Sequence, residues 1–279
     1  LHLAAGQRHA ELIRAEGAGH RRHRLRMGPN SEALLRLEAT QDEAFQTAFL
    51  DIELEAGAQL KLVRVQDADA GAHRITRIRA RLHRDAHLDL TSLDLGGKLS
   101  RHDVCVDLVG PGAQAHLRGL FVCSGSGHTD NHTRVDHRAP HGTSRELFRG
   151  IALDSAHGVF NGKVVVHPGA QKTDSEQRIA NLILSPKAEI NAKPELEIYA
   201  DDVKCAHGAT FGQLDLQALF YLRSRGIPES QARALLQIAF ALEPLRQCPD
   251  AALREELIGK VGRHLGREAL GLTDVAELV

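Results

Sequence analysis

The chain has 279 residues, of which 42% are hydrophobic, so it is long enough to bury a large core. Its 35 basic and 36 acidic residues nearly cancel, and aromatic residues make up only 4%. These values argue against a nucleic-acid-binding protein, which needs basic surface and stacking aromatics. The sequence contains no run of 18 or more apolar residues, so it predicts no association with a membrane.

The start of the chain, residues 1–39, has no clear secondary-structure pattern. It begins "LHLAAGQRHA", without an initiator Met and without a signal-peptide pattern. We interpret this start as a fragment boundary that follows an upstream domain. The basic segment "HRRHRLR" at 20–26 is typical of a solvated strand or loop.

Residues 40–212 carry short alternating segments separated by small or turn-forming residues. Examples are "DIELEAGAQLKLVRVQ", "HLDLTSLDLGG" and "GVFNGKVVVHPGAQ". Alternation with a period of two predicts half-buried strands. Small residues that indicate corners recur every 27 to 29 residues, at Ala58, Ala86, Ala113, Gly142 and Ala170. This spacing favours the rungs of a solenoid over an up-and-down barrel.

The pattern changes to helical at residue 213, and we expect a small helical domain over 213–279. Asp215 is placed as the N-cap of a first helix and Gly226 as its end. A second helix is predicted from Pro228 to Pro244, with one buried face. A third amphipathic stretch covers about 251–265. The residues predicted for the buried face of the second helix are Leu235, Ile238, Ala239 and Leu242.

The four cysteines lie 18, 82 and 43 residues apart, which fits neither a zinc site nor a thioredoxin motif. We therefore expect free thiols in a reducing, cytosol-like compartment. Cys105 in "DVCVDL" and Cys123 in "LFVCSG" have apolar neighbours, so both are predicted to be small buried hydrophobic residues.

Nucleotide-binding motifs are missing from the sequence. The P-loop pattern G-x-x-x-x-G-K-[ST] is absent. The segment "GPGAQA" at 110–115 imitates a dinucleotide-binding turn, but strand-type residues follow it where a helix must begin. The chain itself is therefore predicted to bind no nucleotide.

A second motif of interest is "HTDNHTRVDHRAPHGTS", which holds four histidines within 14 residues. Imidazole is a common metal ligand, so a metal site is one interpretation. The alternation of this segment instead predicts a strand, with His132 and His137 on opposite faces. Hydrogen-bonding histidines are the other interpretation, and the sequence leaves the roles of His128, His132, His137 and His141 open.

The stretch "YADDVKCAHGATFG" at 199–212 is the last β segment before the helices. On a strand, Cys205 and His207 project from the same face while Lys204 and Ala206 face away. Two ligands are too few for a cluster or a closed zinc site, which take four. A site at Cys205 and His207 would thus need ligands from across an interface.

Three segments together resemble a known family. They are "LDLGGKLSRHDV" at 93–104, "DNHTRVDHRAPHGTSRELFRGI" at 130–151, and the long stretch from "GVFNGKVVVHPGAQ" at 158 to "LFYLRSRGI" at 227. The chain resembles the SufB/SufD family of iron-sulfur cluster assembly scaffolds over about residues 40–245. It is more similar to the D-type members, because the B-type usually has Glu at the position of Gly208 and Cys at that of Leu222.

This resemblance implies a mainly β fold, a right-handed parallel β-helix core over 40–212 followed by a small C-terminal helical domain over 213–279. Residues 1–39 would be the first strands after an N-terminal helical region. The implied role is that of a non-catalytic scaffold subunit in a cytoplasmic complex that assembles iron-sulfur clusters and uses ATP. ATP would be hydrolysed by a partner.

The resemblance also implies the partners and the site. A SufB-like sister subunit would join at the β-helix edge, and a SufC-like ATPase would dock on the helices from about 213 to 243. A homodimer of the isolated chain is a further expectation. The iron-sulfur cluster would be transient and shared with the sister subunit, with His207 and Cys205 as the candidate metal ligands.

Two other functions are weighed against this one. The chain could be a purely structural adaptor that recruits the ATPase and supplies no ligands. It could also be a β-helix enzyme that acts on a polysaccharide, for which the fold alone argues. Such an enzyme needs paired carboxylates, and the acidic pairs at 103 and 107 and at 201 and 202 have no evident partner in the sequence.

Overall fold

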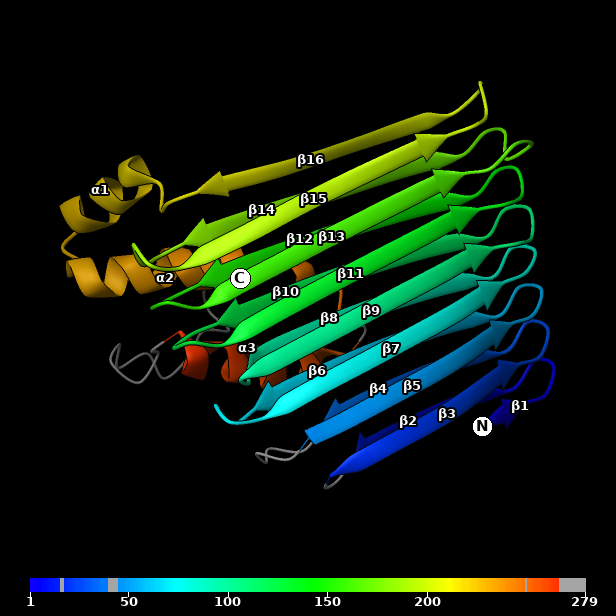
Figure 1. The fold of residues 1–279 in the computed structure, drawn as a ribbon, viewed down its shortest axis with the longest axis horizontal. Helices are drawn as coiled ribbons and strands as arrows, with labels where there is room; N and C mark the ends of the chain where they lie inside the picture. Colours follow the sequence, from blue (N-terminus) through cyan, green and yellow to red (C-terminus); the bar gives the residue numbers. More distant parts are fainter. Residues whose placement is uncertain (16–17, 40–44, 249, 266–279) are drawn as a thin grey trace.

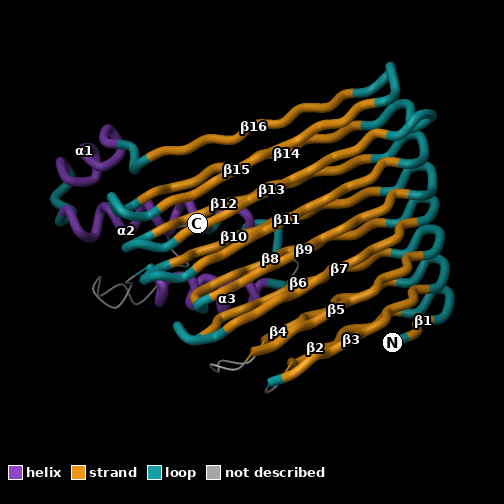
Figure 2. The backbone as a smooth tube through the Cα atoms, in the orientation of Figure 1, coloured by secondary structure: helices purple, strands orange, loops and turns teal. Residues whose placement is uncertain are grey.

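The computed structural model describes residues 1–15, 18–39, 45–248 and 250–265, and it shows a parallel β-solenoid followed by helices (Figures 1 and 2). The strands form two parallel sheets that face each other, and the chain alternates between them. The odd-strand sheet contains β1 (His2–Leu3), β3 (Gly19–Met27), β5 (Phe45–Leu54), β7 (His73–Leu82), β9 (Leu99–Leu108), β11 (His128–His137), β13 (His157–Val166) and β15 (Glu189–Ile198).

The even-strand sheet completes each rung. It contains β2 (Arg8–Ala15), β4 (Glu32–Ala39), β6 (Gln59–Ala68), β8 (His87–Gly96), β10 (Gln114–Cys123), β12 (Thr143–Ala152), β14 (Asp174–Ile183) and β16 (Lys204–Gly212). The predicted mainly β fold, a parallel β-helix core with a helical domain after it, is confirmed. Strands β1 to β4 lie within residues 1–39 and continue the same two sheets.

The corners between the sheets repeat with the rungs, which explains the 27 to 29 residue spacing. The small corner residues predicted from the sequence are buried, and Ala58, Ala86, Ala113 and Ala170 are completely so. One residue with positive φ stands two positions before each of seven even strands: Gly6, Asn30, Gly57, Asp85, Gly112, His141 and Lys172. Left-handed backbone is tolerated best by Gly, Asn and Asp, so this column fixes where the chain turns.

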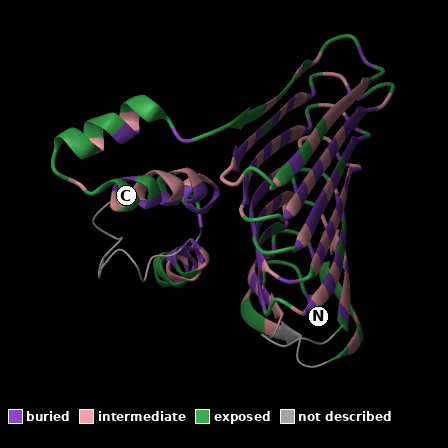
Figure 3. Ribbon diagram, turned by 60° about the vertical axis from the view of Figure 1, so that its left-hand side comes forward, coloured by how far each residue is buried: buried purple, intermediate pink, exposed green. Residues whose placement is uncertain are grey.

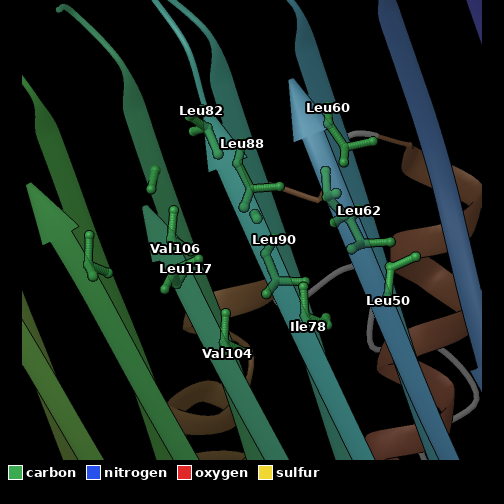
Figure 4. Close-up of a cluster of buried hydrophobic side chains, with 14 of the residues drawn as sticks. Leu50, Leu60, Leu62, Ile78, Leu82, Leu88, Leu90, Val104, Val106 and Leu117 are labelled. Carbon is green, nitrogen blue, oxygen red and sulfur yellow. The ribbon is translucent and has the colours of Figure 1, made fainter. Parts of the chain in front are cut away.

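The interior between the sheets is filled by the inward side chains of each strand (Figure 4). Leu62 and Leu90 from the even strands meet Leu50, Ile78 and Val104 from the odd strands, and all are at most 2% exposed. The alternation of buried and exposed residues appears as bands along the strands in Figure 3. Because a rung pairs only with its neighbours, the core is one continuous column along the stack.

In two neighbouring rungs of the core, each of two glycines lies beside a phenylalanine of the other rung. Gly119 on β10 is the register partner of Phe148 on β12, and Phe121 is the partner of Gly150. A Cβ atom at Gly119 would lie 2.2 Å from the Phe148 ring, which stacks against Phe160 with ring centroids 4.6 Å apart. The glycines therefore make room for the phenylalanines of the next rung.

Gly119→Ala is expected to lower the free energy of unfolding by about 2 kcal/mol or more, because the added methyl would lie 2.2 Å from the buried Phe148 ring and overpack the core. Gly259→Ala is the matched control. Gly259 lies in a helix with nothing within 4 Å of its added Cβ, so this change should stabilise by about 0.5–1 kcal/mol. Urea denaturation of both variants checks the difference, and equal effects would contradict it.

The helical domain packs against the outer face of the even-strand sheet. It contains α1 (Leu216–Ser224), α2 (Glu229–Ala241), the 3-10 helix η1 (Glu243–Leu245) and α3 (Ala251–His264). The predicted N-cap Asp215 is confirmed, since its carboxylate accepts hydrogen bonds from the backbone N–H groups of Gln217 and Ala218. Val65, Leu93 and Leu120 on the outer sheet face form a second buried cluster with these helices. Residues 266–279 of the predicted helical domain lie outside the described residues.

Polar contacts tie the helices to this sheet. Arg36 of β4 donates to Glu256 of α3 at 2.7 Å, and Arg149 of β12 donates to Glu243 at 3.0 Å. Asp67 of β6 contacts the end of α3, where His264 Nε2 lies 2.8 Å from its Oδ1 atom. Within the described residues, none of these helices has both the length and the apolar character needed to cross a bilayer.

Two predictions of burial are wrong. Ile238 and Leu242 are buried as predicted, but Ala239 is exposed and Leu235 is half-buried, because α2 turns Ala234 and Ala241 toward the sheet in their place. Cys105 is half-exposed, because β9 directs Val104 and Val106 inward and its intervening cysteine outward. Cys123 is buried as predicted, and all four thiols are free.

Candidate functional site

The last rung of the solenoid leaves two strands with a free edge. Among the described strands, β16 pairs with β14 alone and β15 pairs with β13 alone. An edge of this kind carries backbone N–H and C=O groups without strand partners, which favours pairing with another chain. Apolar side chains are exposed at this end: Ile198 and Tyr199 at the end of β15, and Phe211 on β16.

Cys205 and His207 both lie on β16 and project from its inward face. Their register partners on β14, Ser175 and Gln177, are at most 2% exposed and point into the solenoid. No described rung covers β16, so His207 is exposed and Cys205 is half-buried although both face inward. The structure thus brings the two residues together on one face, at the open end of the column.

Cys205 stands above a chain of hydrogen-bonded side chains. Ser144 Oγ donates to Ser175 Oγ at 2.8 Å, and His137 Nε2 lies 2.9 Å from Ser144 Oγ. Burial raises the pKa of the Cys205 thiol above its ordinary value of 9.0. The thiol is therefore protonated at neutral pH, and it needs a metal ion or a nearby positive charge to become a thiolate ligand.

His207 stands above a second polar column. Below it, Gln177 Nε2 donates to Glu146 Oε1 at 2.9 Å, and Thr133 Oγ1 donates to Glu146 Oε2 at 2.5 Å. Burial raises the pKa of Glu146, whose side chain lies in the centre of the solenoid. The Oε1 atom of Gln177 is buried and has no hydrogen-bond partner among the described residues.

That free carbonyl oxygen matters because Gln177 is the register partner of His207. A histidine that ligates a metal through one ring nitrogen usually donates the N–H of the other to a carboxylate or carbonyl oxygen. Gln177 offers such an acceptor on the neighbouring strand. Gln177 and Glu146 were not predicted from the sequence, although alternation along "DSEQRIANLI" and "TSRELFRGIA" places polar residues at inward positions.

The four histidines near residue 130 do not converge. His137 points inward, and burial lowers its pKa to about 4. His132 points outward, with its Nε2 atom 2.8 Å from Asp130 Oδ1, and the ring of His128 packs edge-on against that of His157. His141 occupies a turn position with φ of 60°. These positions favour the hydrogen-bonding interpretation over a shared metal site.

Three of the four acidic residues weighed for an enzyme are engaged in ion pairs. Asp103 pairs with Arg101, Asp107 with Arg138 and Asp202 with Lys172. A glycosidase needs two free carboxyls facing each other across a groove. These pairs offer no such arrangement, so no observation favours the polysaccharide enzyme.

Another group of potential ligands, not predicted from the sequence, lies on the outer face of the even-strand sheet. Ligand atoms of His87, Asp89 and His116 all lie within 4.8 Å of one another. Burial lowers the pKa of His116 to about 4 and also lowers that of His87, so both rings are neutral at pH 7. The sequence hides this group, because His116 becomes a neighbour of Asp89 only through strand register.

The helix that follows β16 presents an apolar face to solvent. Leu216, Phe220 and Tyr221 of α1 are 71%, 73% and 56% exposed, while Leu219 is buried. Figure 3 shows α1 standing away from the sheets, with most of its surface exposed. Three residues separate this helix from the end of the last strand, β16.

These features define a class: a parallel β-solenoid whose last rung is open and carries an inward thiol and imidazole, joined to a small helical domain. The family model described as "SUF system FeS cluster assembly, SufBD core domain" matches residues 12–240. The chain belongs to this family, as its resemblance indicated.

Curated relatives agree with this assignment. The chain is 38% identical over 217 residues to the iron-sulfur cluster assembly SufBD family protein slr0076 of Synechocystis, covering 78% of this chain and 48% of the relative. It is 32% identical over 268 residues to the iron-sulfur cluster assembly protein SufD of Escherichia coli, covering 95% and 62%. The chloroplastic protein ABCI7 of Arabidopsis thaliana is 34% identical over 208 residues, covering 74% and 44%. The chain spans about half the length of these relatives.

Proposed function

We propose that this chain is a D-type scaffold subunit that helps to assemble iron-sulfur clusters at its open last rung. The observation that carries the proposal is the placement of Cys205 and His207 together on the inward face of β16, an unpaired edge strand, in a chain of the SufBD family. Its similarity to SufD of Escherichia coli over 95% of the chain supports the D-type assignment.

The partner at this end would be a sister β-solenoid of the SufB type. Strands β15 and β16 offer free edges, and the exposed Ile198, Tyr199 and Phe211 would supply apolar contact area. A second solenoid that pairs with these edges would bring its own side chains over His207. The iron-sulfur cluster, as cargo of the complex, would then take its remaining ligands from the partner.

The ATPase would dock on the helical side. The sequence given has no P-loop, so ATP hydrolysis would belong to another subunit. Leu216, Phe220 and Tyr221 on α1 form the exposed apolar face that would receive it. Because α1 follows β16 after three residues, a movement of this helix would reach the last rung directly.

Within the site, the residues have different roles. The exposed imidazole of His207 would ligate iron, while the Oε1 atom of Gln177 would accept a hydrogen bond from its other ring nitrogen and hold the ring. Cys205 would supply a thiolate once iron is near enough to displace its proton. Glu146 and Thr133 would fix Gln177 from below.

The proposal is tested by His207→Ala in the complex purified anaerobically with its sister subunit and ATPase. We expect the complex to assemble normally and its iron and sulfide content to fall by about tenfold or more. Loss of an outer-shell partner already weakens metal binding by about tenfold, and loss of a ligand should weaken it further. His132→Ala removes a half-exposed imidazole from another strand and serves as control. If the complex carrying both His207→Ala and Cys205→Ser keeps full cluster formation, the structural adaptor is the correct alternative.

A further inference from the structure

The group of His87, Asp89 and His116 has the geometry of a metal site separate from the last rung. His87 and Asp89 are two residues apart on β8 and therefore project from the same face. His116 on β10 is the register partner of Asp89. The two imidazole rings meet edge to face with centroids 4.8 Å apart, and all three ligand atoms lie within 4.8 Å of one another.

We propose that these three side chains bind a divalent first-row transition-metal ion. Two imidazole nitrogens and one carboxylate oxygen are a donor set that suits iron(II), cobalt(II) and zinc(II) and leaves further positions open. Ligand atoms around such an ion lie about 3.4 Å apart, because each bond is about 2.1 Å long. Small side-chain rotations would close the group from its present spacing, while the sheet holds the backbone in place.

The immediate surroundings of this site limit its affinity. Arg118 on β10 forms an ion pair with Asp89 and donates to Gln247 in the loop before α3. This contact competes with a bound ion for the Asp89 carboxylate. It also places a positive charge beside the ion, with Lys61 and Arg145 as further cations near the histidines.

A similar pair of histidines provides the matched comparison. His128 and His157 on the odd-strand sheet stack edge to face with centroids 4.9 Å apart. Within the part of the chain that the structure describes, they do not belong to any group of three ligand atoms within 4.8 Å. His157→Ala therefore removes an equivalent ring without touching the proposed site.

The test measures cobalt(II) binding to the full chain by titration calorimetry and visible absorption, in a Cys205→Ser/His207→Ala background that removes the last-rung ligands. We expect one ion per chain, displaced by zinc(II), in this background and in its His157→Ala derivative. His116→Ala and Asp89→Asn should each weaken cobalt(II) binding by more than about tenfold, because loss of an outer-shell partner alone can weaken metal binding by that much. Because the last-rung ligands are already absent, the result does not depend on the proposed function.

The Arg118→Met variant tests the site further, because its effect on cobalt(II) binding would not be seen if the two histidines only packed against each other. Removing the charge while keeping an apolar stem should tighten cobalt(II) binding by about tenfold, since a unit charge at ion-pair distance repels the ion by that order. Absence of binding, or binding that His116→Ala and Asp89→Asn leave unchanged, would overturn the proposal. Weaker binding in Arg118→Met would also count against it.

Discussion

Asp67→Asn is expected to loosen α3 from the solenoid and to lower the free energy of unfolding by about 2 kcal/mol. Asp67 is 6% exposed on β6 and contacts one imidazole and two cationic side chains of α3. His264 Nε2 lies 2.8 Å from Oδ1, while Lys260 and Arg263 lie 3.3 Å and 3.5 Å from Oδ2. The variant leaves these three groups without a carboxylate at the sheet surface.

The measurement is urea denaturation together with amide hydrogen exchange, which reports local opening of α3. Asp69→Asn is the matched control, because it makes the same change two residues further along at an exposed position. It should leave both readouts unchanged. Equal exchange of the α3 amides in the two variants would show that Asp67 does not hold the helix.

The same carboxylate predicts a pH dependence. Burial by itself raises the pKa of Asp67, but the hydrogen bond and charge of His264, together with Lys260, outweigh burial and lower the pKa from 3.8 to about 2. A carboxyl group whose pKa is lower in the folded than in the unfolded chain stabilises the fold fully at pH values above its unfolded pKa. This stabilisation is lost as the pH falls through the folded pKa. The stability difference between the wild-type chain and Asp67→Asn should therefore be complete at pH 6 and shrink between about pH 4 and pH 2.

Much of the solenoid could be predicted from the sequence because the structure of each rung requires the same residue types at the same spacing. Each rung must turn at a corner with room for no more than a small residue, so Ala58, Ala86 and Ala113 recur at one spacing. Strand alternation alone also placed His132 and His137 on opposite faces. These features depend on residues that are close in sequence, so they can be predicted without the structure.

Features that depend on how elements pack against one another could not be predicted from the sequence. The outward position of Cys105 follows from which face of β9 is buried, and the exposure of Ala239 follows from the direction in which α2 meets the sheet. Cys205 and His207 could be predicted to share a face because both lie on one strand. The residues that support them, Gln177 and Glu146, come from other rungs, and only the register places them below.

Gln177→Leu is expected to reduce the iron content and cluster formation of the assembled complex by about 10- to 100-fold, as loss of an outer-shell partner does. Leu keeps the volume of the side chain but removes the Oε1 acceptor beneath His207 and the donor to Glu146. Without that acceptor, the His207 ring would lose its fixed tautomer and orientation. The readout is iron and sulfide per anaerobically purified complex.

Asn181→Leu separates this effect from general damage to the core. Asn181 is a buried amide on the same inward face of β14, but its register partner is Phe211 instead of His207. Both variants should lose about 1–3 kcal/mol of stability from disturbed buried polar groups. Only Gln177→Leu should lose iron.

The decisive comparison places Gln177→Leu in the His207→Ala background. If Gln177 acts through His207, the second change should cause no further loss of iron, because residues of one network are not additive. A further loss would mean that Gln177 affects the last rung by another route, through Cys205 or through the pairing of β16 itself. The cycle thus distinguishes a positioning residue from one that merely keeps the final strand in place.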